Sequence, residues 1–162
     1  MHSMNEFRQH LTKEDVKWVY NKYLLGHDVW YFRERLGQAR YAYTYDDLKL
    51  YISDKLELHI NNIAIVGSAK LGFSLSPKQN KMFQAFGDNS DVDLVVVSAE
   101  LFRKSWDAFL DLSGKVYLPN YNMVAGNIFR RFVSLKNPDT RNEFFSEWNR
   151  KVEPCKKDLQ TL

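Results

Sequence analysis

The chain has 162 residues, of which 44% are hydrophobic, 27% charged and 15% aromatic. This composition excludes a disordered chain and predicts a single folded domain over residues 1–162, large enough to bury its own core. The 23 basic and 20 acidic side chains leave a net charge of +3. Such a mild excess of positive charge permits a nucleic-acid partner without indicating one.

Targeting signals are not evident in the chain. No run of 18 apolar residues is present, and the first residues lack the apolar core of a signal peptide, so we expect neither a membrane span nor secretion. The single Cys155 rules out an internal disulfide, which favours a reducing cytoplasm. Residues 1–4 are interpreted as an expression scar before a native Met4, and the polar residues 153–162 are expected to fray.

Three helices are predicted before residue 60, because apolar residues recur there at helical spacing behind polar or capping residues. The segments are 12–25 with Thr12 as the cap and Gly26 as the stop, 28–39, and 44–59 with Thr44 and Asp47 as a capping box. Arg33, Arg35 and Arg40 accompany the second helix. We interpret them as a solvated basic face, the alternative being an arginine surface for phosphate or nucleic acid.

Two short runs rich in β-branched residues predict adjacent, buried strands. The first run, Ile63–Val66, ends in Gly67-Ser68, and the second is opened by Asp91-Val92-Asp93. Alternate residues of a strand point to one face, so the carboxylates of Asp91 and Asp93 should project together. Paired buried carboxylates require a cation, and hard oxygen ligands of this kind suit Mg²⁺ or Mn²⁺.

The order of strand, Gly67-Ser68, strand and Asp91-Val92-Asp93 resembles the nucleotidyltransferase superfamily, which includes polymerase-β-like enzymes, poly(A) polymerases and small bacterial members. The resemblance implies an α/β (α+β) fold in which helices flank a small mixed sheet. It also implies that Gly67 and Ser68 hold the triphosphate of an NTP, with Lys70 adding positive charge. Asp91 and Asp93 would hold two divalent ions, and an NMP would pass to a hydroxyl of a protein, an RNA or a small molecule.

Residues 69–90 form an insertion of 22 residues between the two motifs, about twice the gap that the resemblance implies for minimal members. Residues 69–74 can form one or two helical turns, and turn-forming residues follow. One interpretation is a flap over the nucleotide, in which Lys78 or Lys81 reaches phosphate and Phe83 or Phe86 stacks on the base. The other is a plain surface loop.

Three further helices are predicted after the second strand, together with one short extended segment. These elements are 100–112 capped by Ser98, an extended or strand segment 115–118, 122–135, and 141–151 behind a turn at 137–140. Arg130 and Arg131 lie 100° apart on the third of these elements, so at least one should face water or a phosphate.

The third carboxylate that the resemblance implies has no obvious source, because residues 115–118 contain no acid. Asp88 and Asp111 are candidates. The alternative is a catalytically silent fold that binds a nucleotide, nucleic acid or protein as part of a toxin–antitoxin or phage-defence pair.

Two further interpretations stay open. One is a basic nucleic-acid-binding module, and the other is a chance Asp-x-Asp at a solvated strand edge with no metal. The arginines of the basic module would be Arg33, Arg35, Arg40, Arg130 and Arg131.

Overall fold

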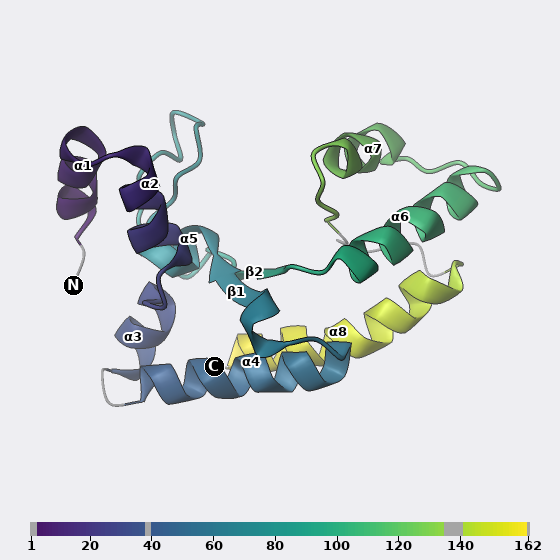
Figure 1. Cartoon of the computed structure of the whole chain (residues 1–162), viewed down its shortest axis with the longest axis horizontal. Coiled ribbons are helices and arrows are strands. Elements are labelled where there is room, and N and C mark those ends of the chain that lie inside the picture. Colours follow the sequence, from purple (N-terminus) through teal and green to yellow (C-terminus); the bar gives the residue numbers. More distant parts are fainter. Residues whose placement is uncertain (1–2, 38–39, 135–140, 162) are drawn as a thin grey trace. The chain divides into compact units, whose positions relative to one another are not determined.

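The computed structural model describes residues 3–37, 40–134 and 141–161 of the chain. It is mainly helical, with one two-stranded antiparallel sheet, and so belongs to the α+β class (Figure 1). The chain divides into two compact units. Unit 1 consists of residues 1–53 and 59–96, and unit 2 consists of residues 54–58 and 97–162. Each unit contains buried hydrophobic residues of its own.

The amino-terminal part of unit 1 contains three short helical segments where the sequence predicted one helix from Thr12. These are α1 (Met4–Lys13), α2 (Val16–Val19) and the π-helical segment η1 (Tyr20–Leu25). The prediction was wrong because Asp15 accepts a hydrogen bond from the Trp18 N–H at 3.0 Å and begins a new helix. Ser3 caps α1 in the same way, so this residue of the segment interpreted as a scar takes part in the fold. Gly26 ends the series, as predicted.

Two further helices follow, and the second of them ends in unit 2. They are α3 (Trp30–Leu36) and α4 (Tyr41–Leu56), and the 3-10 turn η2 (Ile60–Asn62) follows. The α4 helix begins three residues before the predicted cap at Thr44. Val29 and Phe32 are fully buried, and the ring of Phe32 packs on Tyr45 with 5.3 Å between centroids.

The sheet consists of β1 (Ile63–Val66) and β2 (Asp93–Val96), and the short helix α5 (Gly67–Leu71) follows β1 directly (Figure 1). The strands pair antiparallel, with Ile63 opposite Val96 and Val66 opposite Asp93. The predicted adjacency is therefore confirmed, whereas no parallel partner makes the sheet mixed in the described residues.

Burial differs between the two strands. Ile63 and Ile65 of β1 are buried, and the Ile65 N–H donates to the Tyr45 hydroxyl at 3.2 Å. All four residues of β2 are exposed or half-buried, so the prediction of a buried second strand was wrong. The reason is that β2 pairs with β1 alone in the described residues, and neither face of β2 is fully covered by the core. A run of β-branched residues predicts a strand but does not reveal how much of it is buried.

Unit 2 contains α6 (Ala99–Ser113), α7 (Tyr121–Phe129) and α8 (Glu143–Thr161), and Ser98 caps α6 as predicted. Residues 115–118 form no strand. The α8 helix continues through Pro154, so the tail that we expected to fray is helical as far as Thr161. The predicted turn at 137–140 lies outside the described residues. The buried core of unit 2 is Ala108, Phe109, Leu112, Ile128 and Phe145.

Candidate functional site

Gly67 and Asp93 meet where β1 passes into α5. They are neighbours because Val66 pairs with Asp93 in the antiparallel register. A Cβ atom on Gly67 would lie 2.7 Å from Oδ2 of Asp93, and Gly67 has a φ of +68°. The left-handed conformation thus favours glycine here, and its absent side chain lets the carboxylate lie close to the backbone at the start of α5.

Asp91 lies just before β2 rather than within it, but its charge still reaches Asp93. Burial raises the pKa of Asp93, and the neighbouring Asp91 carboxylate raises it further. Neither acid forms an ion pair within the described residues. Two close carboxylates without a cation repel one another, and their hard oxygen atoms are the donor type that Mg²⁺ or Mn²⁺ prefers. The residues present therefore fit a divalent cation.

Ser68 follows Gly67 in the first turn of α5. Its carbonyl accepts the Gly72 N–H at 2.8 Å, which closes the short helix at a left-handed glycine. The α5 helix packs on α3, β1 and β2. The structure therefore brings Gly67, Ser68 and Asp93 to one corner of unit 1, with Asp91 adjacent in the chain.

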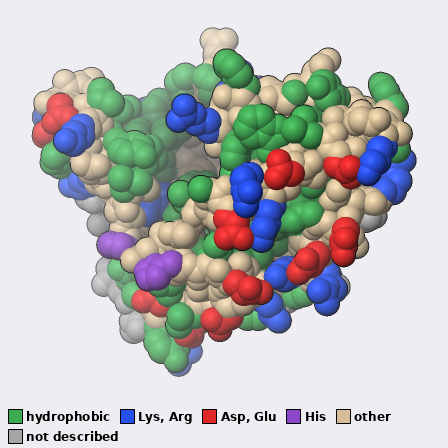
Figure 2. All heavy atoms as spheres, turned by 45° about the vertical axis from the view of Figure 1, so that its right-hand side comes forward, with side chains coloured by type: hydrophobic (Ala, Val, Ile, Leu, Met, Phe, Trp, Pro, Cys, Tyr) green, Lys and Arg blue, Asp and Glu red, His purple; other side chains and the backbone are tan. Residues whose placement is uncertain are grey.

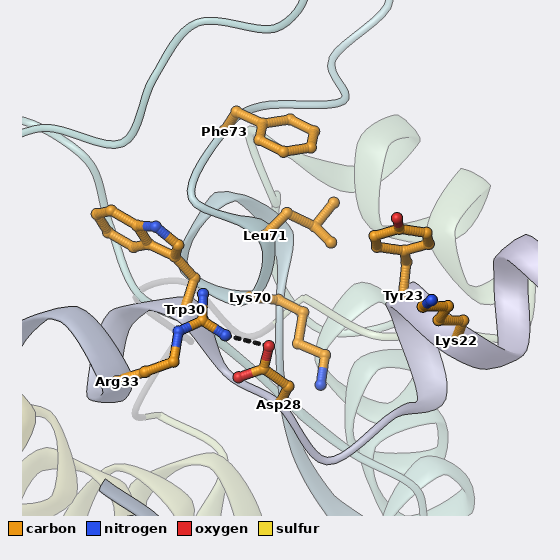
Figure 3. A pocket seen from close by; sticks show the side chains of 8 residues that line it. All are labelled: Lys22, Tyr23, Asp28, Trp30, Arg33, Lys70, Leu71 and Phe73. Carbon is orange, nitrogen blue, oxygen red and sulfur yellow. Dashed lines mark hydrogen bonds and ion pairs between the residues drawn. The ribbon is translucent and has the colours of Figure 1, made fainter. Parts of the chain in front are cut away.

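Lys70 is the predicted site residue that the structure places elsewhere. Its side chain is 6% exposed, and its ammonium donates to the carbonyl oxygen of Gly26, 44 residues away in the chain. Figure 3 shows the Lys70 side chain extending towards Asp28. Burial lowers the pKa of Lys70 to about 8, and the negative charge of Asp28 opposes part of that shift. In this structure Lys70 ties α5 to the segment between η1 and α3.

This buried lysine lines a small pocket (Figure 3). Asp28 accepts a hydrogen bond from Arg33 through Oδ2, while its Oδ1 is buried without a hydrogen-bond partner in the described residues. The cavity measures about 40 Å³, which is room for a few water molecules. Its lining residues are Lys22, Tyr23, Asp28, Trp30, Arg33, Lys70, Leu71 and Phe73.

Arg33 therefore differs from its expected place on a solvated face. Its side chain is 12% exposed and paired with Asp28. Arg40 is exposed, as expected for a basic face, and the side chain of Arg35 lies outside the described residues. Sequence reasoning missed the cluster of Lys70, Asp28 and Arg33, since no local pattern connects residues so far apart in the chain.

The insertion folds back onto unit 1 as a loose hairpin. Phe73 and Ala85 form an isolated bridge, and the Phe86 N–H donates to the Gly72 carbonyl at 2.8 Å. Phe83 lies 6.0 Å from Phe73 between ring centroids, and the Arg8 guanidinium lies 4.3 Å from the Phe83 centroid. The rings of Trp30 and Tyr31 pack on Phe86 at 5.5 and 5.6 Å.

The aromatic rings of the insertion are thus engaged with the protein itself. The flap interpretation had assigned Phe83 or Phe86 to a nucleotide base, and in this structure both rings pack on side chains of unit 1. Lys78 and Lys81 are exposed at the tip of the hairpin. The lysines, rather than the rings, are therefore available to an incoming ligand.

In the part of the chain that the structure describes, no third carboxylate joins Asp91 and Asp93. No three His, Cys, Asp or Glu side chains of that part lie close enough together to hold a metal ion. Asp111, one candidate, lies in unit 2 and pairs with Lys115 at 2.5 Å. The hydrogen bond from Lys115 lowers the pKa of Asp111. Asp88, the other candidate, is exposed in the insertion.

Comparison with known proteins supplies no relative for this chain. No protein-family model matches it, and neither a curated protein nor a solved structure shows significant similarity to it. Among the described residues, every helix is too short or too polar to cross a bilayer.

Proposed function

We propose that the chain is a nucleotidyltransferase-like protein that transfers an NMP from an NTP to a hydroxyl group with the help of Mg²⁺ or Mn²⁺. The hydroxyl oxygen forms a bond to the α-phosphorus, the bond from the α-phosphorus to the β-phosphate breaks, and pyrophosphate leaves. The observation that carries this proposal is the approach of the Asp93 carboxylate to Gly67 at the start of α5, with Asp91 close enough to raise its pKa. This corner combines oxygen donors for a divalent ion with backbone N–H groups of the Gly67-Ser68 turn, which can donate to phosphate oxygens.

The residues of this corner divide into two roles. Asp91 and Asp93 would hold the divalent ions, which when bound neutralise the triphosphate and activate the attacking hydroxyl. Gly67 and Ser68 would bind and orient the phosphates through backbone N–H groups and the serine hydroxyl. Lys70 takes a supporting role, because its ammonium is bonded to Gly26 and holds α5 in place.

The direct test incubates the protein with each α-labelled NTP, Mg²⁺ and a mixture of protein and RNA acceptors. We expect labelled acceptor with the wild type and none with the Asp91→Ala/Asp93→Ala double variant. Asp54→Ala, which removes an exposed acid of α4, is the matched control and should keep wild-type transfer. Transfer that persists in the double variant would exclude the proposed metal site.

A second candidate is a protein that binds the NTP without transferring it. The lack of a third carboxylate beside Asp91 and Asp93 in the described residues favours this candidate. It predicts that Mg²⁺ and an NTP together raise the melting temperature of the wild type while no acceptor becomes labelled. Loss of that thermal shift in the double variant would assign binding to the same corner.

A further inference from the structure

A stretch without acidic residues runs from Leu112 to Pro138 in unit 2. It contains four basic residues, namely Lys115, Arg130, Arg131 and Lys136, and four aromatic ones, namely Tyr117, Tyr121, Phe129 and Phe132. Each of these aromatic side chains is at least 45% exposed, and Phe129 is 90% exposed. Lys115 pairs with Asp111, whereas the arginines of the stretch lie beside exposed rings, and this composition suits a polyanion carrying flat aromatic groups.

The end of α7 concentrates these features in four consecutive residues, Phe129-Arg130-Arg131-Phe132, which we call the Phe129–Phe132 turn. Both arginines are exposed, in agreement with the sequence expectation that at least one would face solvent. Within the described residues neither forms an ion pair or a side-chain hydrogen bond. Their charges are therefore available to a ligand.

The backbone of the turn places Arg131 in a conformation that arginine rarely adopts. The Phe132 N–H donates to the Asn127 carbonyl at 3.1 Å and the Arg131 N–H to the Ile128 carbonyl at 2.8 Å, which is the Schellman pattern that ends a helix. The residue in the left-handed position of that pattern is normally glycine, but here it is Arg131 with a φ of +64°. An arginine in a strained position beside a 90% exposed phenylalanine points to a use other than folding.

We propose that the Phe129–Phe132 turn binds single-stranded nucleic acid, with bases stacked on Phe129 and Phe132 and phosphates neutralised by Arg130 and Arg131. A single strand fits better than a duplex because its bases expose faces for stacking, whereas paired bases in a helix do not. If the strand is the acceptor of the transferred NMP, its terminal or ribose hydroxyl receives the nucleotide. That assignment rests on the proposed function, whereas binding itself does not.

The test measures fluorescence anisotropy of labelled 12-nucleotide RNA and DNA strands titrated with the full chain at several salt concentrations. Phe129→Ala should weaken binding about 5-fold to 150-fold, the range for loss of one stacked base. Arg130→Ala/Arg131→Gly should lower the slope of log affinity against log salt by about 1.4. Met123→Ala, which removes another exposed apolar side chain of α7, is the control and should bind as the wild type does.

Arg131→Gly by itself separates binding from folding. Glycine is the favoured residue at this left-handed position, so the variant should melt at the same or a higher temperature while binding the strand more weakly. A variant that gains stability and loses affinity cannot owe its defect to misfolding. Weaker binding together with a lower melting temperature would contradict the role that we assign to Arg131.

Three outcomes overturn the proposal. One is no binding of RNA or DNA by the wild type, and another is binding that Phe129→Ala and Arg131→Gly leave unchanged. The third is a wild-type dimer in size-exclusion chromatography that Phe129→Ala converts to a monomer, which would make the turn a self-association surface. Strand binding by Asp91→Ala/Asp93→Ala without NMP transfer supports the inference, because binding needs no catalysis. Phe129-dependent binding without transfer by the wild type would remove only the acceptor assignment.

Discussion

Asp93 is the residue at which chemistry and fold constrain each other most closely. Its carboxylate lies against the backbone of Gly67 and beside Asp91, and both burial and the second acid raise its pKa. An acid whose pKa is raised in the folded state destabilises the protein increasingly as pH rises from its unfolded-state pKa through its folded-state pKa, and the penalty is complete above the latter. A divalent cation bound by the two carboxylates would remove the penalty.

The first prediction concerns Asp93→Asn. Without divalent ions at pH 7, we expect this variant to melt at the same temperature as the wild type or higher, because the amide removes the repulsion from Asp91. The wild type should gain melting temperature on addition of Mg²⁺ and an NTP, and the variant should not. Differential scanning fluorimetry measures both effects, with Asp54→Asn as the control. An equal gain in the Asp93→Asn variant would contradict the metal site.

The second prediction concerns the buried Lys70. Its pKa is about 8 in the folded state against 10.5 for the unfolded chain, so between these values the unfolded state binds more protons and stability rises with pH. From pH 8 to 9.5 the free energy of unfolding should increase by about 2 kcal/mol in the wild type relative to Lys70→Met. Urea unfolding at each pH measures this difference. Parallel pH profiles for the two proteins would show that Lys70 is not buried as an ammonium.

At the scale of single elements, local capping and backbone conformation determined where helices begin and end. The sequence predicted one helix from Thr12 to Leu25, whereas the capping side chain of Asp15 starts a second helix and separates α2 from α1. The α7 helix ends at Phe129, although the apolar spacing continued, because Arg131 adopts a left-handed conformation. Capping residues occur at many positions in the sequence, so spacing alone does not show which of them begins or ends a helix.

The third prediction concerns the insertion. Phe86 anchors it by packing on Trp30 and Tyr31, so Phe86→Ala should lower the free energy of opening the hairpin by about 1–3 kcal/mol, the range for two aromatic pairs. Trypsin should then cut after the exposed Lys78 and Lys81 about 5-fold to 150-fold faster, because cleavage follows the population of the open state. Met82→Ala changes an exposed side chain of the same hairpin and should be cut at the wild-type rate. Unchanged cleavage of the Phe86 variant would show that these ring contacts do not hold the insertion.

At the scale of the whole molecule, the chain divides into two compact units, and each contains a cluster of buried hydrophobic residues. The single domain expected from the sequence stays a prediction. The predicted site residues all belong to unit 1, and the Phe129–Phe132 turn belongs to unit 2. The two proposals thus concern different units and can fail independently.

The fourth prediction uses this division. Phe109 is buried in unit 2, and Phe109→Ala should cost about 3–5 kcal/mol of stability there by leaving a cavity. Hydrogen exchange followed by mass spectrometry should show faster exchange in residues 97–134 and 141–155, with a smaller change in residues 4–37. The matched variant Phe7→Ala in unit 1 should give the opposite distribution. Uniform acceleration over the whole chain in both variants would mean that the two cores unfold as one.

The sequence by itself determined the local elements that depend on neighbouring residues: the strand Ile63–Val66, the adjacency of the second strand, the stop at Gly26 and the cap at Ser98. Only the tertiary structure decided that Gly67 meets Asp93, that β2 stays half-exposed and that Lys70 turns towards Gly26. The physical reason is the distance along the chain over which each interaction acts. Propensity, capping and side-chain alternation act over a few residues, whereas burial and electrostatic partners depend on segments that lie tens of residues apart in the chain.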